Sequence, residues 1–317
     1  MENHGVLKGY IYAGAGAALF STKAIFIKLA YREEVNAALM LALRMVTALP
    51  FFLAAGVYAY YVMRKRGVAP PSADLIVKAL LTGFVGYYLS ALLDFEGLVY
   101  ISAQLERLVL FTYPMFVMFL GWMFFGARLT WWGILAAAIT YAGLVIVFIN
   151  DLPVGGSATV IGTALVLGCA LTFAIYQLLA KKYITIMGST LFTALAMSAS
   201  AFACIAHYMV VSRSLDFSAS PKFLGLAAGC GFFATVLPSF LVNAALSRIS
   251  PISTSMIATI SPLITISLAV WILGEAFTVS DAVGSLMVIA GVAIYAVTDR
   301  RPVGPPAASS LVAEGSG

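Results

Sequence analysis

The feature that most restricts the fold of this chain is an internal repeat: its second half matches its first at one constant offset, roughly half the chain length. The matched pairs include Leu98 and Leu246, Ser102 and Ser250, Pro114 and Pro262, Gly126 and Gly274, Thr130 and Thr278, and Gly143 and Gly291. The glycine and proline pairs carry the argument, because leucine and alanine coincide often in any apolar chain. The sequence therefore predicts two copies of one structural unit.

Composition indicates a membrane protein. Hydrophobic residues make up 62% of the chain and charged residues 10%, whereas soluble proteins have about half and about a quarter. A helix needs about 20 apolar residues to cross a bilayer. Because lipid offers no hydrogen-bond partners to the backbone, spans of this length are expected to be helices, which pair their own N–H and C=O groups. Ten spans are predicted: 9–30, 37–62, 75–95, 99–126, 131–150, 158–180, 188–211, 222–246, 250–274 and 279–298.

The two copies are expected to lie upside down relative to each other, because each contains an odd number of spans. We predict an all-α integral membrane protein of two inverted five-helix repeats, 1–150 and 151–300, with a disordered tail at 301–317 that is rich in Pro, Ala, Ser and Gly. Inverted repeats are typical of membrane transporters, whose substrate site lies between the halves. The three cysteines fall inside spans, so no disulfide framework is expected.

The positive charges favour one orientation. With ten spans both termini share a side, and most of the Lys and Arg residues outside the spans fall there: Lys8, Arg64, Lys65, Arg66, Lys78, Arg128, Lys181, Lys182, Arg248, Arg300 and Arg301. The other side receives mainly Arg32, Arg213 and Lys222. By the positive-inside rule both termini are cytoplasmic. The net charge of +5 therefore indicates orientation, and no nucleic-acid partner is expected.

Both halves carry an apolar helix with a central proline, then a Gly-x-x-x-Thr segment and a Gly-rich final helix. The second copy reads Gly-Glu-Ala-Phe-Thr at 274–278, whereas the first reads Gly-Ala-Arg-Leu-Thr at 126–130, with Ala127 in place of the glutamate. Together with Lys23 in the first span and Arg44 in the second, this pattern resembles the EamA type of the drug/metabolite transporter superfamily, over nearly the whole chain. Within it the chain looks most like the YddG-type amino acid exporters.

Four charged residues are embedded in the first half, where burial in lipid is costly unless they face a cavity or a partner. They are Lys23, Arg44, Glu106 and Arg107, and a structural ion-pair network and a substrate or proton site are the two interpretations. Glu106 and Arg107 are adjacent, so they point about 100° apart on a helix. Because Glu106 matches the polar Thr254, we assign Glu106 to the pathway and expect Arg107 to turn to a neighbouring helix. Lys23 lies deep in its span and is also assigned to the pathway. Arg44 is only two turns into its helix, so we assign it, with Arg107, to an ion-pair network.

Two further stripes predict walls of a pathway. Positions 84, 87, 91 and 95 of the third span and positions 232, 235, 239 and 243 of the eighth lie on helical stripes. For the aromatic members, plain packing is the alternative. The predicted pathway residues are Phe20, Lys23, Phe84, Tyr87, Glu106, Tyr176, Gln177, Phe232, Thr235, Ser239 and Asn243.

The matched prolines Pro114 and Pro262 each remove a backbone hydrogen bond within a span. They predict either hinges for alternating access or static kinks that shape a cavity, and the sequence does not choose between the two.

The resemblance implies a multi-pass exporter in a bacterial inner membrane that moves small organic solutes, above all amino acids and related metabolites, around a central cavity. Proton coupling through a carboxylate such as Glu106 stays open. A drug or other metabolite exporter, an importer, a receptor and a membrane enzyme are the alternatives. The only histidines are His4 and His207, and no haem or metal ligand pair or ATP-binding loop is present, so neither catalysis nor a cofactor or metal is expected.

Overall fold

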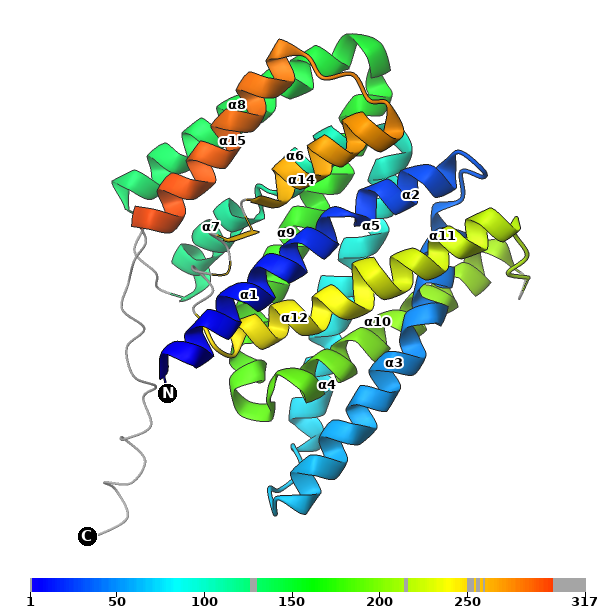
Figure 1. The fold of residues 1–317 in the computed structure, drawn as a ribbon, viewed down its shortest axis with the longest axis vertical. Coiled ribbons are helices and arrows are strands. Elements are labelled where there is room, and N and C mark those ends of the chain that lie inside the picture. The colour runs from blue at the N-terminus through cyan, green and yellow to red at the C-terminus, as the bar shows by residue number, and fades with distance from the viewer. Residues whose placement is uncertain are drawn as a thin grey trace.

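The protein is an all-helical bundle in the residues that the computed structural model describes, which are 2–125, 130–213, 216–249, 254, 257, 258 and 260–298 (Figure 1). The predicted tail 301–317 lies outside them, as do Arg128, Arg300 and Arg301. The α-helices are α1 Glu2–Ser21, α2 Lys23–Tyr31, α3 Ala37–Lys65, α4 Ala73–Gly83, α5 Ser90–Tyr100, α6 Ala103–Leu110, α7 Tyr113–Phe125, α8 Trp131–Gly155, α9 Ser157–Met187, α10 Ser189–Ser212, α11 Pro221–Gly231, α12 Leu237–Leu246, α14 Ile260–Leu268 and α15 Val279–Thr298. Three segments are π-helical: η1 Phe84–Leu89, η2 Phe232–Val236 and η3 Ala269–Leu273.

Eight helices of the described residues are long and apolar enough to cross a membrane. They are Val6–Tyr31, Ala37–Lys65, Ala73–Tyr100, Ala103–Phe124, Trp131–Ile149, Ser157–Met187, Ser189–Ser212 and Pro221–Leu246. Two shorter apolar helices, Ser261–Leu273 and Val279–Gly291, fall where the last two spans are predicted. A polytopic membrane protein is thus confirmed, whereas the full count of ten spans stays a prediction.

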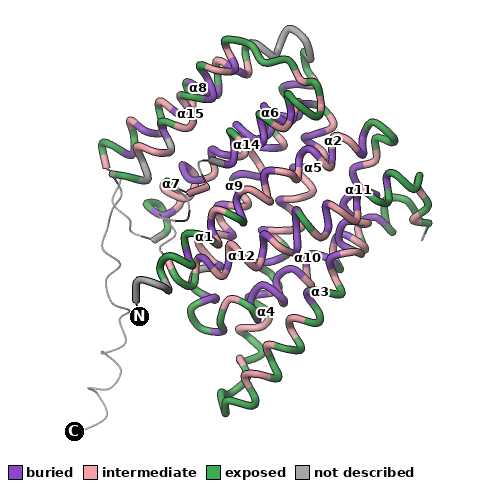
Figure 2. The backbone as a smooth tube through the Cα atoms, in the orientation of Figure 1, coloured by how far each residue is buried: buried purple, intermediate pink, exposed green. Residues whose placement is uncertain are grey.

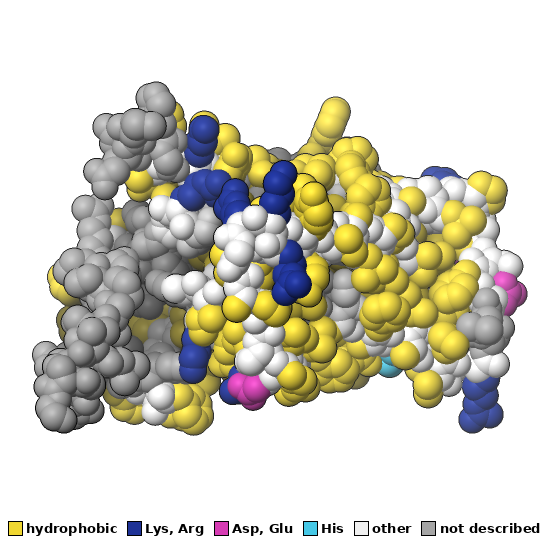
Figure 3. Space-filling view, turned by 90° about the horizontal axis from the view of Figure 1, so that it is seen from below, with side chains coloured by type: hydrophobic (Ala, Val, Ile, Leu, Met, Phe, Trp, Pro, Cys, Tyr) yellow, Lys and Arg dark blue, Asp and Glu magenta, His cyan; other side chains and the backbone are white. Residues whose placement is uncertain are grey.

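The outer faces of the bundle are apolar. Buried residues face the inside of the bundle, while exposed ones lie on its outer faces and ends (Figure 2). Large side chains such as Trp131, Trp271 and Val279 are 73%, 84% and 80% exposed, which a protein in water rarely tolerates over so wide a surface. Hydrophobic side chains predominate on the face in Figure 3, where most of the Lys and Arg lie towards one side and a few at the opposite end. These faces suit contact with lipid.

Polar residues begin several helices by accepting a hydrogen bond from a backbone N–H that the helix leaves unpaired. Asn36, Ser72, Ser102 and Ser220 each accept from the N–H three residues further on, at 3.0, 3.3, 3.0 and 3.1 Å. The matched threonines of the repeat do the same. Thr130 accepts from the N–H of Gly133 at 3.1 Å, and Thr278 from that of Asp281 at 3.2 Å. The threonine of the Gly-Glu-x-x-Thr motif is therefore a helix cap.

Helices far apart in sequence pair side by side, namely α1 with α12, α3 with α10, α5 with α9, and α8 with α15 (Figure 1). Glycines bring α8 and α15 together. A Cβ at Gly143 would lie 2.6 Å from the carbonyl oxygen of Gly284, and one at Gly291 would lie 2.7 Å from that of Ala136. Only a residue without a side chain permits backbones this close.

Several spans are interrupted near the middle of the bundle. Thr22 separates α1 from α2, and Phe111 and Thr112 separate α6 from α7. The π-helical segments η1 and η2 begin at Phe84 and Phe232, which are matched positions of the repeat. Such interruptions change which side chains face inward, and π-helical turns occur often at functional sites.

Candidate functional site

A cavity of about 150 Å³ lies at the centre of the bundle. At about 10–15 Å³ for each water molecule it holds roughly ten of them, which is the size of a small organic solute. The lining residues are Phe20, Lys23, Arg44, Gly86, Tyr87, Ser90, Ala91, Asp94, Arg107, Leu110, Phe111, Tyr113, Cys169, Phe173, Gln177, Val242, Leu246, Thr254 and Ser261. Both matched halves of the chain therefore contribute walls.

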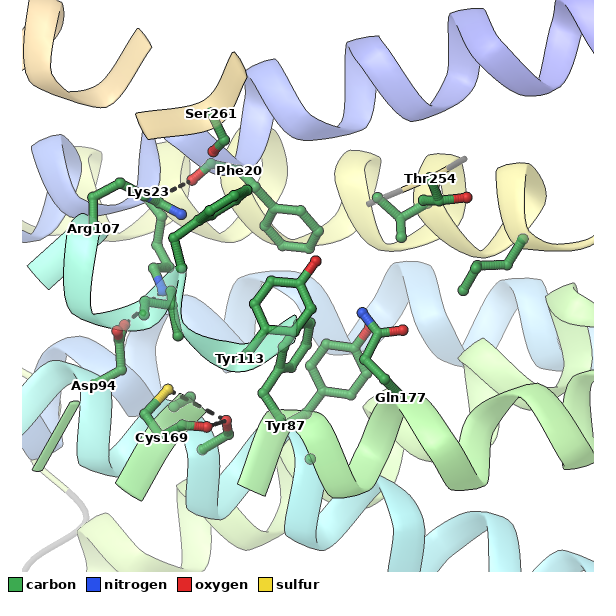
Figure 4. A pocket seen from close by; sticks show the side chains of 18 of the residues that line it. Phe20, Lys23, Tyr87, Asp94, Arg107, Tyr113, Cys169, Gln177, Thr254 and Ser261 are labelled. Carbon is green, nitrogen blue, oxygen red and sulfur yellow. Dashed lines mark hydrogen bonds and ion pairs between the residues drawn. The ribbon is translucent and has the colours of Figure 1, made fainter. Parts of the chain in front are cut away.

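The kind of side chain that lines the pocket changes along its length (Figure 4). Lys23, Asp94 and Arg107 gather at one end, aromatic Tyr87 and Tyr113 lie in the middle, and Gln177 and Thr254 lie towards the other end. Asp94 and Arg107 are buried, whereas Tyr87, Tyr113, Gln177 and Thr254 are half-buried. The charged end is thus the more enclosed one.

The break between α1 and α2 brings Phe20 and Lys23 to the pocket. Where a helix is interrupted, carbonyl groups lose their partners within the helix. Here the carbonyl of Phe20 accepts from Nη2 of Arg107 at 3.0 Å, and that of Ser21 accepts from the Thr265 hydroxyl at 3.0 Å. The hydroxyls of Ser21 and Ser261 also lie 2.7 Å apart. These contacts tie the break to α6 and α14.

Lys23 is the centre of a buried ion cluster. Its Nζ lies 2.6 Å from Oδ2 of Asp94 and 3.7 Å from Oε1 of Glu106. Oε2 of Glu106 lies 3.9 Å from Nε of Arg107. The Lys23 side chain is 13% exposed and those of both acids are almost fully buried. The cluster links α2, α5 and α6.

The structure differs from the sequence interpretation of this cluster in two ways. Arg107 lines the pocket and Glu106 lies behind it, the reverse of the predicted orientation. Arg44 is in none of the ion pairs of the described residues; its guanidinium lies 4.6 Å from the centre of the Phe95 ring. The acids face Lys23 instead, since Asp94 and Glu106 come from helices that pack against α2.

Aromatic rings form the middle of the pocket. Tyr87 packs edge-on against Tyr176, with ring centres 4.7 Å apart and hydroxyl oxygens 3.2 Å apart. Tyr113 packs edge-on against Phe173 at 5.2 Å, and Phe173 stacks on Tyr176 at 5.8 Å. Edge-to-face pairs fix the orientation of the rings. Tyr176 stands behind Tyr87 and supports the wall.

The polar residues of the eighth span lie outside the pocket lining. Thr235 donates to the carbonyl of Cys230 at 3.0 Å, and Ser239 to that of Thr235 at 2.5 Å. Asn243 donates to the Thr193 hydroxyl at 2.7 Å. Ser239 and Asn243 also come within hydrogen-bonding reach of Tyr87. They form a polar layer behind the wall, next to Tyr87.

Of the other predicted pathway residues, Phe20 and Gln177 line the pocket, whereas Phe84 and Phe232 do not. Phe84 is 44% exposed and packs against Tyr88, and Phe232 packs against Phe51 and Phe233. The π-helical turn that starts at each of these two phenylalanines breaks the α-helical stripe on which their prediction depended.

Pro114 and Pro262 lie in the first turns of α7 and α14 rather than within uninterrupted helices. Proline fits a first turn, because that turn has no backbone acceptor for an N–H. Pro114 is the second residue after the break at Phe111 and Thr112. Whether either proline moves stays a prediction.

Tyr113 and Ser261, a matched pair of the repeat, line the pocket without having been predicted from the sequence. Each stands immediately before one of the repeated prolines, and that position was the signal that could have found them. Asp94, which the sequence places at a span end, is another lining residue.

Hydrogen bonds between a loop and the start of α6 lie close to the charged end of the pocket. The carboxylate of Glu275 accepts from the backbone N–H groups of Ala103 and Gln104, at 2.9 and 3.2 Å. The Gln104 amide donates to the carbonyl of Ala276 at 2.9 Å, and Arg32 donates to that of Leu273. The glutamate of the second Gly-Glu-x-x-Thr motif thus caps α6, which carries Glu106 and Arg107.

A polytopic helical bundle with a polar and aromatic pocket between its helices is typical of a membrane protein that handles small solutes. The EamA-like transporter family matches this chain twice, over residues 7–149 and 160–297. The chain belongs to the EamA-like transporter family. Family membership favours transport over catalysis.

Individual relatives agree with this family. An uncharacterized transporter of Bacillus subtilis, YcbK, is 27% identical over 291 residues, covering 87% of this chain and 88% of its own. An uncharacterized transporter of Clostridium kluyveri is 24% identical over 172 residues, covering 53% and 55%. A crystal structure with 16% identity covers 92% of this chain and 98% of its own, with a TM-score of 0.63. That likeness concerns the fold alone.

Proposed function

We propose that this protein exports small organic solutes, chiefly amino acids and related metabolites, by alternating access around the central pocket. The observation that carries the proposal is the pocket itself, which both halves of the chain line and which combines a charged end with an aromatic middle. Aromatic walls suit the apolar part of such a solute, and the charged end suits an ionised group.

Alternating access requires two halves that can rock against each other, and the proposal includes two inverted five-helix repeats. The crossing of α8 and α15 supports it. Exchanging each residue for its repeat partner turns the contact of Gly143 with Gly284 into the contact of Gly291 with Ala136, and both occur. The family's two matches, one in each half, are also in keeping with a duplicated unit.

We further propose a bacterial inner membrane location with ten spans and cytoplasmic termini. The basic residues of the sequence favour this orientation. The relatives in two bacteria are in keeping with the location.

Flux of radiolabelled amino acids in liposomes tests the function. We expect liposomes that contain the protein to move amino acids faster than empty ones, and excess unlabelled amino acid to slow the labelled flux. Flux of drugs without flux of amino acids would indicate a drug exporter, and absence of flux for either class would contradict the proposal.

Coupling to protons is tested in the same liposomes with an imposed pH gradient. If Glu106 carries the proton, the gradient accelerates flux, and Glu106→Gln removes this acceleration while substrate binding persists. If the pH gradient does not change the flux through the unmutated protein, the protein is a facilitator without proton coupling.

A further inference from the structure

Arg44 carries a charge that no described acidic group balances. It lies in α3, lines the pocket and is 5% exposed, and its Nε and Nη2 atoms have no hydrogen-bond partner. A guanidinium remains protonated at any physiological pH. Burying a charge without a counter-charge is strongly unfavourable. An anion in the pocket would balance the charge of this buried, unpaired arginine.

The rest of the pocket does not supply this anion. Lys23 pairs with Asp94 at 2.6 Å, and Glu106 lies between Lys23 at 3.7 Å and Arg107 at 3.9 Å. Among these described residues two acids thus face two cations, and Arg44 is a third cation. The pocket keeps one excess positive charge, and it is Arg44 rather than Lys23 that is available to a solute.

The geometry of Arg44 narrows the kind of anion. Nε and Nη2 share one edge of the planar guanidinium, and their parallel N–H groups match the two oxygens of a carboxylate. Phe95 packs on the face of the guanidinium, whose Cζ lies 4.6 Å from the ring centre. This contact holds the plane of the group, while the Nε and Nη2 edge is buried and has no protein partner. An edge of this shape suits a carboxylate.

We propose that Arg44 binds the carboxylate of the transported solute, so that the pocket accepts small solutes with a carboxylate and rejects the same solutes without it. The inference rests on the proposed function and names the group that its substrates share. An amino acid and a simple organic acid both carry this group, and the experiment separates them.

Three probes that share one ring test the inference: L-phenylalanine, 3-phenylpropanoate without the amine, and 2-phenylethylamine without the carboxylate. Binding is measured as thermal stabilisation of the purified protein, and transport as liposome flux. We expect stabilisation by L-phenylalanine and none by 2-phenylethylamine. Arg44→Met should weaken L-phenylalanine binding at least about tenfold, and Arg44→Lys should weaken it less. Equal binding of 3-phenylpropanoate would extend the class to organic acids.

Arg248→Met is the matched control, because Arg248 also packs on an aromatic ring, Tyr12 at 5.2 Å, yet is exposed and outside the pocket lining. We expect the Arg248→Met protein to bind L-phenylalanine with the affinity of the unmutated protein. Arg44→Met should unfold at the same or a higher temperature than the unmutated protein, because no protein partner loses its counter-charge. If Arg44 had only a structural role, Arg44→Met would lower the unfolding temperature and leave the affinity for L-phenylalanine unchanged.

Binding of 2-phenylethylamine as tight as that of L-phenylalanine would overturn the inference, as would full affinity in Arg44→Met. If Arg44→Met fails to fold, the test uses Arg44→Lys instead, and unchanged L-phenylalanine affinity of that variant would overturn the inference. Failure of all three probes to bind also overturns it. Carboxylate-dependent binding without flux would leave the inference intact and contradict the proposed function instead, so the two can fail separately.

Discussion

At the scale of single residues, the placement of charge is the most informative feature of this protein. A buried ion pair gains little over apolar packing, but the loss of one partner leaves an uncompensated charge in a medium of low dielectric constant. Lys23 and Asp94 form such a pair at 2.6 Å. Their role is to balance each other across α2 and α5, which leaves Arg44 for a solute.

We expect Lys23→Met or Asp94→Asn alone to lower the free energy of unfolding by about 3–5 kcal/mol. The double variant should lose less than the sum of the two, because it removes both charges together. Thermal or denaturant unfolding in detergent measures these effects.

Lys78→Met is the control for this pair. Lys78 pairs with Asp74 at 2.5 Å, but both side chains are exposed, so a change below about 1 kcal/mol is expected. Additive effects in the Lys23 and Asp94 double variant would show that the two side chains do not interact.

At the scale of elements, the Gly-Glu-x-x-Thr motif of the second half acts through helix ends. Gly274 adopts a φ of 70°, a left-handed conformation that glycine tolerates best. It ends η3 and turns the chain so that Glu275 meets two N–H groups at the start of α6. The first copy has Ala127 at the corresponding position, and alanine has no side-chain acceptor. The two copies therefore differ in this interaction.

Glu275→Ala should lower the free energy of unfolding by about 0.5–2 kcal/mol, because two backbone N–H groups at the start of α6 lose their acceptor. Thermal unfolding measures this effect. Glu33→Ala serves as the control, since Glu33 pairs with the exposed Lys222 side chain at 2.6 Å rather than with a helix end. Equal effects of the two substitutions would contradict a capping role.

The crossing of α8 and α15 gives a second prediction at this scale. Gly143→Ala and Gly291→Ala should each cost about 1–3 kcal/mol of stability, because the added methyl group meets the backbone of the other helix. In α11, Gly225→Ala meets nothing within 4 Å and should be neutral or stabilising by about 0.5–1 kcal/mol. Unfolding midpoints of the three variants compare them directly, and a Gly143→Ala protein as stable as Gly225→Ala would disprove the tight crossing.

At the scale of the whole molecule, orientation in the membrane decides what the pocket faces. Figure 1 has the start of α1 and the end of α15 at the same end of the bundle. If that end is cytoplasmic, the loop after α3 is cytoplasmic too, and the loop before α11 is external. The enclosed, charged end of the pocket then lies towards the outside.

A membrane-impermeant thiol reagent checks this orientation in intact cells. We expect Val68→Cys to react only after the cells are permeabilised, and Ser218→Cys to react without that treatment. Both positions are exposed, whereas Cys169, Cys204 and Cys230 are buried, so the unmutated protein should give little background. The opposite labelling pattern would invert the topology.

The sequence alone determined the helical membrane class, the family resemblance and the positions of most helices, because long apolar segments and matched Gly and Pro residues are local signals. It also located four lining residues, Phe20, Lys23, Tyr87 and Gln177. Only the tertiary structure decided which charge faces which. Breaks such as that at Thr22 and the π-helical turns rotate side chains off an ideal helical stripe, and a partner such as Asp94 for Lys23 comes from another helix. The spacing of residues along the chain shows neither where a helix breaks nor which helix supplies a partner. Arg44 therefore becomes the unpaired charge at the pocket only when the helices have packed.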